Sequence, residues 1–246
     1  MNYDNPSPIA PVISVVLPVY NEEACIDGVL DELCAVLDAR LGRPYEVLAV
    51  DDGSSDRTPE LLRAQAARRR NLRMLRLVPN AGQSAAFCAG FRAARGAIVV
   101  TLDADGQNDP ADIPGVVAKI SDTVDCCCGY RARRQDTASK RWGSRLANAV
   151  RNCALHETII DTGCSVKAFK VEFVRTLQPW DGLHRFFASF VAMQGGRIVQ
   201  IPVNHRPRSA GTSKYTNWRR LRKTIRDLRG VAWLKSRTRK CEVREE

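Results

Sequence analysis

Short runs of β-branched and other apolar residues alternate with longer, helically periodic segments along the first hundred positions of the chain. The runs predict four strands, at residues 13–19, 46–50, 72–78 and 97–102. Helices are expected from about residue 56 onwards, over 84–95, and over 24–41, where the periodic apolar positions are Ile26, Val29, Leu30, Leu33, Leu37 and Leu41. Because the strands are apolar throughout and are separated by helices, the pattern predicts an α/β fold with a mostly parallel central sheet and helices on both faces.

Polar clusters follow three of these four strands, at the point where each strand is expected to end. The clusters are Tyr20-Asn21-Glu22, Asp51-Asp52-Gly53-Ser54 and Asp103-Ala104-Asp105. Ligands of parallel sheets bind beyond the carboxyl ends of the strands. We therefore expect the three clusters to lie around one site.

The segment after the fourth strand carries Asp103, Asp105, Asp109 and Asp112. Carboxylates this close repel one another unless a cation lies among them. An Asp-x-Asp pair suits Mg²⁺, which takes the rest of its ligands from water and substrate phosphates, and Gln107 offers a further neutral oxygen. The alternative is a solvated turn in which Asp109-Pro110 opens a helix. The second acidic strand end at Asp51-Asp52 favours the metal site.

The net charge of +11 is concentrated near the C-terminus. Residues 1–205 hold 24 Lys and Arg against 23 Asp and Glu, whereas residues 206–246 hold 14 against 4. A basic tail of this kind indicates an anionic partner. No stretch approaches the roughly 20 apolar residues that span a bilayer, and no signal peptide is evident, so we expect a cytoplasmic protein. The nine cysteines contain no Cys-x-x-Cys pair, which favours buried, reduced thiols over a zinc site.

A series of motifs resembles glycosyltransferase family 2, and within it the polyprenyl-phosphate and dolichyl-phosphate sugar transferases. The first four are Leu17-Pro18-Val19-Tyr20-Asn21-Glu22, Asp51-Asp52-Gly53-Ser54, Asn80-x-Gly82 and Asp103-Ala104-Asp105-Gly106-Gln107. The later ones are Gly129-Tyr130-Arg131, Asp161-Thr162-Gly163-Cys164, and the run 201–208 with Gly211-Thr212-Ser213-Lys214. The resemblance covers about residues 12–216.

The resemblance implies a GT-A catalytic domain over 1–216, and the concentration of basic residues predicts a separate basic tail over 217–246. The resemblance also implies inverting transfer of a sugar from a nucleotide diphosphate-sugar to a polyprenyl phosphate, with Mg²⁺ or Mn²⁺ as cofactor. Catalytic Asp105 would bind the metal together with Asp103 and Gln107. The residues that would bind the nucleotide-sugar are Pro18, Tyr20, Glu22, Asp51, Asp52, Asp103, Ala104, Arg208 and Lys214.

The expected acceptor is already a good nucleophile. The second pKa of a phosphate monoester is near 6, so a lipid phosphate is mostly dianionic at neutral pH and needs cationic groups rather than a strong base. By resemblance, Arg131 and Arg141 bind this phosphate. Asp161 is expected to be catalytic, as an orienting group or a base, although it would alternatively pair with an arginine. His184 either borders the acceptor entrance or is a packing residue.

The tail has the pattern of an amphipathic helix. Basic residues fill much of its surface, and one face carries Trp218, Leu221, Ile225, Leu228 and Ala232. We expect this helix to hold the protein on the anionic cytoplasmic face of the membrane, since each basic residue near such a surface contributes about 1 kcal/mol. A helix docked on the catalytic domain has the same period and stays open as the alternative. Attachment through a membrane partner subunit, or a homo-oligomer, also stays open.

Two other functions are compatible with the sequence. A family 2 transferase with a glycan hydroxyl acceptor would need a true base. A non-enzymatic module for nucleic acid or another anionic surface would explain the sequence pI near 9.5. The charge-balanced first 205 residues and the lack of a nucleic-acid readout motif in the tail disfavour the module, so we expect no nucleic-acid partner.

Overall fold

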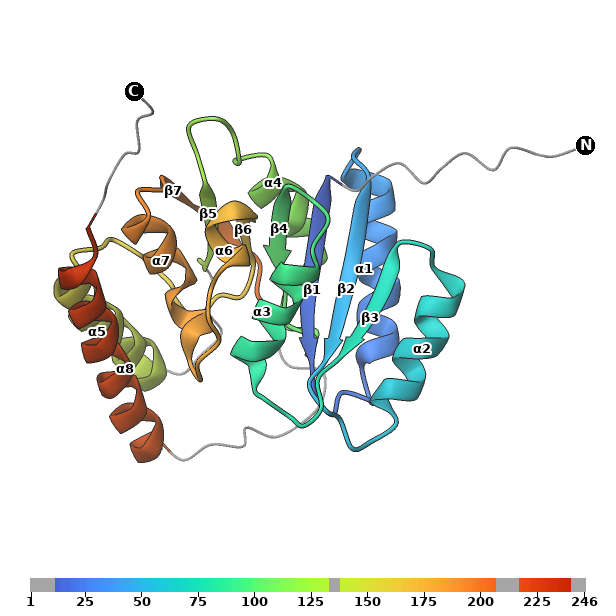
Figure 1. The fold of residues 1–246 in the computed structure, drawn as a ribbon, viewed down its shortest axis with the longest axis horizontal. Coiled ribbons are helices and arrows are strands. Elements are labelled where there is room, and N and C mark those ends of the chain that lie inside the picture. Colours follow the sequence, from blue (N-terminus) through green and yellow to red (C-terminus); the bar gives the residue numbers. More distant parts are fainter. Residues whose placement is uncertain (1–11, 133–137, 207–216, 240–246) are drawn as a thin grey trace, which may run out of the picture.

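The protein is built around one seven-stranded sheet (Figure 1). The structure is a computed structural model that describes residues 12–132, 138–206 and 217–239, with the backbone alone for 138–146 and 217–222. The strand order is β3-β2-β1-β4-β6-β5-β7. The strands are β1 (Ile13–Val19), β2 (Tyr45–Asp51), β3 (Leu72–Arg76), β4 (Ile98–Thr101), β5 (Cys126–Arg131), β6 (Lys167–Lys170) and β7 (Ile198–Val203).

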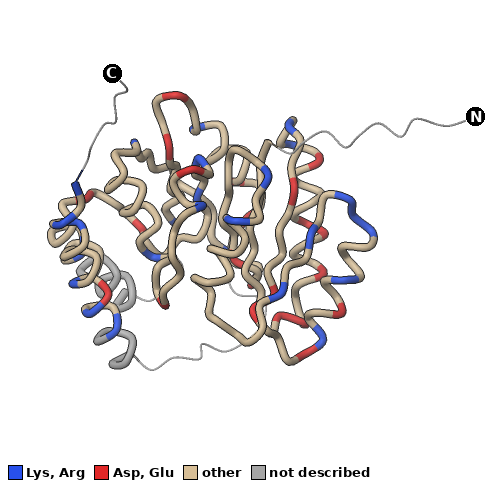
Figure 2. The backbone as a smooth tube through the Cα atoms, in the orientation of Figure 1, with Lys and Arg blue, Asp and Glu red and all other residues tan. Residues whose placement is uncertain are grey.

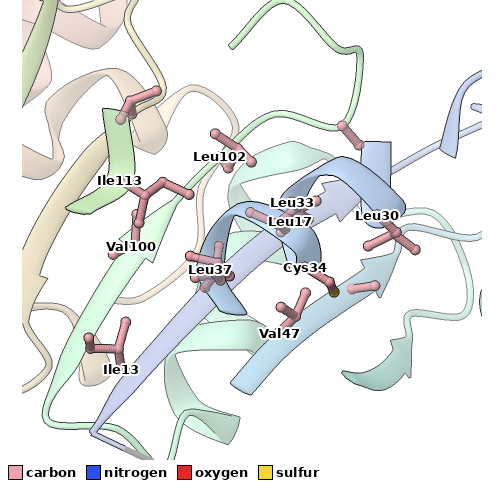
Figure 3. Close-up of a cluster of buried hydrophobic side chains, with 14 of the residues drawn as sticks. Ile13, Leu17, Leu30, Leu33, Cys34, Leu37, Val47, Val100, Leu102 and Ile113 are labelled. Carbon is pink, nitrogen blue, oxygen red and sulfur yellow. The ribbon is translucent and has the colours of Figure 1, made fainter. Parts of the chain in front are cut away.

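Helices cover both faces of the sheet (Figure 1). They are α1 (Ile26–Arg40), α2 (Thr58–Arg68), α3 (Gln83–Ala93), α4 (Ile113–Val117), α5 (Ala138–Leu155), α6 (Glu172–Arg175), α7 (Phe187–Met193) and α8 (Asn217–Arg237), with 3₁₀ turns η1 (Pro110–Asp112) and η2 (Leu183–Phe186). Side chains of alternate residues in β1 point to opposite faces of the sheet. Ile13, Val15 and Leu17 pack with α1 in one core cluster, of which Figure 3 shows the centre, whereas Val16 packs with α3 in the other.

The predicted mostly parallel sheet is confirmed. One strand, β6, runs in the opposite direction and determines which loops lie together at the candidate site. Strands β1, β2, β3 and β4 are parallel to one another, and every residue of β1 is buried. Strand β6 runs antiparallel to both β4 and β5. Strand β5 therefore points the same way as β4, and the loop that enters β6 lies at the edge of the sheet where β4 and β5 end.

The sequence pattern located the early elements to within a few residues. The third strand is shorter than predicted and ends at Arg76, because Val78 is 81% exposed and Pro79 cannot donate to a ladder. The expectation of buried thiols holds for six of the eight described cysteines, while Cys153 is exposed and Cys25 is half-buried. Across the described part of the chain, no helix is both long and apolar enough to pass through a bilayer.

The C-terminal helix packs on the rest of the protein. Val231 of α8 is buried against Leu155 and Phe186, with Leu228 and Ala232 beside it. Of the predicted apolar face, Leu228 and Ala232 are thus used for docking, whereas Ile225 is 43% exposed. The docked alternative describes this part of α8. The other faces of this helix carry exposed groups, among them Trp233 and Leu234.

Gly90 is a position where α3 needs the absence of a side chain. A Cβ atom there would lie 2.3 Å from Val16 Cγ1 of β1. We expect Gly90→Ala to destabilise the protein by about 1–3 kcal/mol through overpacking. Gly28→Ala on α1, where nothing lies within 4 Å of the new Cβ, should instead stabilise it by about 0.4–1 kcal/mol. Urea unfolding of both variants measures the two free energies; equal effects of the two substitutions would contradict this packing.

Candidate active site

Three strand ends meet at one edge of the sheet, as the polar clusters predicted. Strand β1 lies between β2 and β4, so the residues that follow these strands are neighbours. The Asn21 N–H donates to Ser54 Oγ at 2.9 Å, which joins the first cluster to the second. The Cys25 thiol lies 3.2 Å from Glu22 Oε2 and 3.5 Å from the Ala104 carbonyl oxygen, which joins the first to the third. Pro18 and Tyr20 belong to the same edge, at the end of β1.

The acidic residues after β2 hold loops in place. Asp51 is fully buried; its Oδ1 accepts a hydrogen bond from the Ser54 N–H, and its Oδ2 lies 3.0 Å from Arg76 Nε. Asp52 accepts bonds from the N–H groups of Ala81 and Gly82, at 2.8 and 2.9 Å, and so fixes the turn before α3. Both carboxylates thus have structural partners in addition to the nucleotide contacts that the sequence predicts for them.

Asp103 is held from two sides by residues that the sequence analysis did not identify. Gln83 Nε2 donates to its Oδ1 at 2.8 Å, and the Ser165 hydroxyl donates to its Oδ2 at 2.7 Å. Asn108 Nδ2 in turn donates to Ser165 Oγ at 2.9 Å. Gln83 and Ser165 are 20 and 62 residues from Asp103 in sequence, so no local sequence pattern predicts that they bind it.

The pair Asp103 and Asp105 fits a hard divalent cation. Burial raises the pKa of Asp103, and the neighbouring Asp105 carboxylate raises it further, which is the repulsion that a cation would relieve. Gln107 is close by, and its N–H donates to Asp105 Oδ1 at 3.1 Å. Among the described residues no group of three or more His, Cys, Asp and Glu side chains forms a metal cage. Two carboxylates are nevertheless enough protein ligands for Mg²⁺, which takes its remaining ligands from water and phosphate oxygens.

Asp161 forms an ion pair with Arg131. Arg131 Nε donates to Asp161 Oδ2 at 2.7 Å, and Arg131 Nη2 donates to Oδ1 at 2.9 Å. Both side chains are mostly buried, and the Gly163 N–H also donates to Oδ1. The pairing with an arginine, which the sequence left as an alternative for Asp161, is therefore present. Because both oxygens are engaged, the carboxylate orients the guanidinium directly.

His184 is tied to the start of α3. Its Nδ1 lies 2.9 Å from the Ser84 hydroxyl, which also accepts the N–H groups of Gly182 and His184. Burial first, and then the positive charge of Arg185, lowers the pKa of His184 to about 3. The imidazole is thus neutral at physiological pH, and its Nδ1 accepts a hydrogen bond from the Ser84 hydroxyl, as expected of a packing residue.

Three of the predicted site residues have no side chain that the structure describes. Arg208 and Lys214 lie outside the described residues, and Arg141 lies in the part of α5 described by its backbone alone. A further buried cation, Lys167 of β6, lies near the site and donates from Nζ to the Cys164 carbonyl oxygen. Its charge, like that of Arg131, opposes the rise in the pKa of Asp103.

Comparison with known families agrees with this geometry, since the family model described as glycosyl transferase family 2 matches residues 14–178. The chain belongs to glycosyl transferase family 2. Relatives in this family include the undecaprenyl-phosphate 4-deoxy-4-formamido-L-arabinose transferases of Pseudomonas aeruginosa (strain LESB58) and Edwardsiella ictaluri (strain 93-146). The first is 38% identical over 212 residues, covering 85% of this chain, and the second is 36% identical over 205 residues, covering 82%. The chain spans 62% of the length of each.

Solved structures confirm the GT-A fold predicted for this family 2 chain. Glucosyl-3-phosphoglycerate synthase from Mycobacterium tuberculosis, in complex with Mn²⁺, uridine diphosphate and phosphoglyceric acid, superposes with a TM-score of 0.69 at 19% identity, covering 94% of this chain and 80% of that one. A mannosyltransferase from Pyrobaculum calidifontis, in complex with GDP-Man and Mn²⁺, gives 0.62 at 22% identity, covering 96% and 67%.

The buried imidazole predicts an acid-sensitive stability. Because the pKa of His184 in the folded protein is about 3, below the unfolded value near 6.5, the unfolded state binds more protons between these values and stability falls as pH decreases through this range. We expect His184 to contribute about 2–3 kcal/mol to the loss of stability between pH 7 and 4.5. Urea unfolding at both pH values should show a smaller loss in His184→Gln. The control is His156→Gln at an exposed imidazole, and an equal loss in wild type and His184→Gln would refute the assignment.

Proposed function

We propose that this protein transfers a sugar, with inversion, from a nucleotide diphosphate-sugar to a polyprenyl phosphate. The observation that carries the proposal is the closeness of a cationic group, Arg131, to the carboxylate pair of the donor site. Arg131 pairs with Asp161, and the same loop carries Ser165, whose hydroxyl donates to Asp103 Oδ2 at 2.7 Å. A phosphate bound by Arg131 would thus lie beside the donor diphosphate. The names of the similar undecaprenyl-phosphate transferases support the same acceptor class.

On the donor side, Asp103 and Asp105, with Gln107 nearby, would hold Mg²⁺ or Mn²⁺. The cation would neutralise charge that develops on the departing nucleotide diphosphate. Asp103 is already fixed by Gln83 and Ser165, so little reorganisation is needed when the cation binds. Pro18, Tyr20, Glu22, Asp51 and Asp52 would surround the base and ribose.

On the acceptor side, the nucleophile is the phosphate itself. A dianionic oxygen has no proton to lose before it attacks the anomeric carbon, so the site needs positioning rather than a base. Asp161 is suited to positioning because its two carboxylate oxygens hold the Arg131 guanidinium in one orientation. A glycan hydroxyl acceptor would require a base, and Asp161 could serve as one only by weakening its bonds to Arg131. The geometry therefore favours the lipid phosphate.

A membrane-bound acceptor requires the enzyme to act at the membrane surface, and we place it on the cytoplasmic face. Figure 2 shows Lys and Arg along the described part of α8. Arg226 and Arg229 are exposed, and further along the helix Trp233 is 63% and Leu234 38% exposed. The docked face of α8 is formed by other residues, so these groups are available to an anionic bilayer.

The proposed reaction is tested by incubating the protein with nucleotide-sugars of different bases and sugars, undecaprenyl phosphate and Mn²⁺ or Mg²⁺. We expect one donor to yield a lipid-linked sugar by mass spectrometry, and a chelator to stop the reaction. Asp105→Ala should reduce turnover by about 10²–10³-fold, because charge on the leaving group is no longer neutralised. Asp122→Ala at an exposed position is the control.

In the same assay, Arg131→Ala should raise the acceptor concentration needed for half-maximal rate while nucleotide binding persists. Collapse of nucleotide affinity with unchanged acceptor dependence would reverse the assignment of Arg131. Transfer to a glycan hydroxyl and none to the lipid phosphate would refute the proposed acceptor.

Membrane attachment through α8 predicts salt-sensitive binding to vesicles. The protein should sediment with anionic liposomes at low salt and be released at high salt. Arg226→Gln with Arg229→Gln should weaken binding by about 2 kcal/mol, or roughly 30-fold, because each charge contributes about 1 kcal/mol. The matched control is Arg63→Gln with Arg68→Gln on α2, at the other end of the molecule (Figure 1). Equal loss in both double variants would refute α8 as the anchor, and absence of liposome binding by the intact protein at low salt would favour a membrane partner subunit.

A further inference from the structure

The acidic segment after β4 divides into two pairs with different partners. Asp103 and Asp105 belong to the site described above. Asp109, which precedes the η1 turn, and Asp112, which ends it, instead bind the chain that leaves β7. The Asn204 N–H donates to Asp112 Oδ2 at 2.7 Å, and Arg206 Nη2 lies 2.9 Å from Asp109 Oδ1. The crowding of four carboxylates is thus relieved at one end by a cation of the protein itself.

Arg206 joins three parts of the molecule that are distant in sequence. Its Nη1 donates to both carboxylate oxygens of Glu32 on α1, at 2.8 and 2.9 Å. Its Nη2 pairs with Asp109 before η1, and its own backbone follows β7. One guanidinium therefore links α1, the acidic segment and the end of β7. The planar guanidinium group of one arginine can bind two carboxylates at once through N–H donors that point in fixed directions. The ammonium group of a lysine does not fix the directions of its partners in this way.

The backbone connects this junction to the metal site. The Arg206 N–H donates to the Gln107 carbonyl oxygen at 2.9 Å, and His205 pairs with Asn108 in an antiparallel bridge. The Gln107 N–H donates to Asp105 Oδ1 at 3.1 Å. The backbone of Gln107 thus accepts a hydrogen bond from the backbone of Arg206 and donates one to the Asp105 carboxylate. Asn108 adds a second connection, because its side chain donates to Ser165, which donates to Asp103.

We propose that Arg206 is a positioning residue for the metal and diphosphate site. By joining Glu32 to Asp109 it holds residues 105–109 in the conformation that presents the Asp105 carboxylate to a divalent cation. The inference rests on the proposed function only in taking Asp103 and Asp105 as the cation ligands. The ion pairs of Arg206 are partly exposed, at 39% for Arg206 and 44% for Glu32, so they add little to global stability. Their effect is on local geometry, to which a bound metal is sensitive.

The test is Mn²⁺ binding, followed by electron paramagnetic resonance, alone and with whichever of UDP, GDP, CDP and dTDP binds most tightly. We expect Arg206→Ala to weaken Mn²⁺ binding about tenfold, in the range that loss of a ligand-orienting partner produces. Arg206→Lys should recover part of this loss, because the charge remains while the bidentate fork is gone. Glu32→Gln should act in the same direction as Arg206→Ala, with a smaller effect.

The matched control is Arg69→Ala. Arg69, which directly follows α2, forms a 2.6 Å ion pair with Asp31, the residue before Glu32 on α1, and does not belong to the acidic segment. Thermal melting should shift alike for the two alanine variants, while only Arg206→Ala alters Mn²⁺ binding. Identical Mn²⁺ titrations for Arg206→Ala, Arg69→Ala and wild type would overturn the inference.

The same titrations separate this inference from the proposed function, since they contain no sugar and no lipid acceptor. Weaker Mn²⁺ binding in Arg206→Ala, with no transfer to undecaprenyl phosphate by the wild type, would uphold the positioning role and refute the acceptor. Wild-type Mn²⁺ binding that is unchanged by Asp105→Asn would remove the cation site and this inference with it.

Discussion

The loops of this site are held by aspartate carboxylates that accept hydrogen bonds from backbone N–H groups a few residues further along. The donors of such bonds, at 3.0 to 3.1 Å, are the N–H groups of Ser54, Thr58, Gln107, Ala111 and Gly163, each bonded to the aspartate two or three residues before it. Each bond compensates both a carboxylate and a loop amide that no sheet or helix satisfies. The loops at the carboxyl edge of the sheet therefore have defined conformations before any ligand is bound.

The partners of Asp103 that the structure describes differ from those of the other aspartates at this edge of the sheet. Asp109 has Arg206, Asp161 has Arg131 and Asp51 has Arg76. Asp103 has neutral donors, Gln83 and Ser165, and lies next to a second carboxylate whose charge raises its pKa. A buried carboxylate whose pKa is raised by burial and by a second carboxylate is typical of a functional site.

The reversal of β6 brings the second half of the site into place. Since β6 is antiparallel to β4, the loop over residues 161–165 lies beside the end of β4, where Asp103 begins the acidic segment. Strand β5 is antiparallel to β6 and so delivers Arg131 to the same edge. In a sheet parallel throughout, this loop would enter its strand at the opposite edge, and Asp161 and Ser165 would be a strand length away from Asp103. The donor and acceptor groups of the proposed reaction are thus neighbours because of strand direction.

Local pattern determined much of this protein by itself. The period of the apolar residues defined β1, α1 and α3, because burial of one face imposes the spacing directly on the sequence. The polar clusters after three strands identified the edge of the sheet where the candidate site lies, since parallel strands end at one edge. Only the tertiary structure decided which groups meet: Ser165 with Asp103, Asp161 with Arg131, and Arg206 with both Glu32 and Asp109. It also decided that α8 uses Val231 to dock, a residue outside the predicted apolar face. Such pairings depend on strand order and direction and on the angles between elements, and the spacing of residues along one element carries no information about its partner.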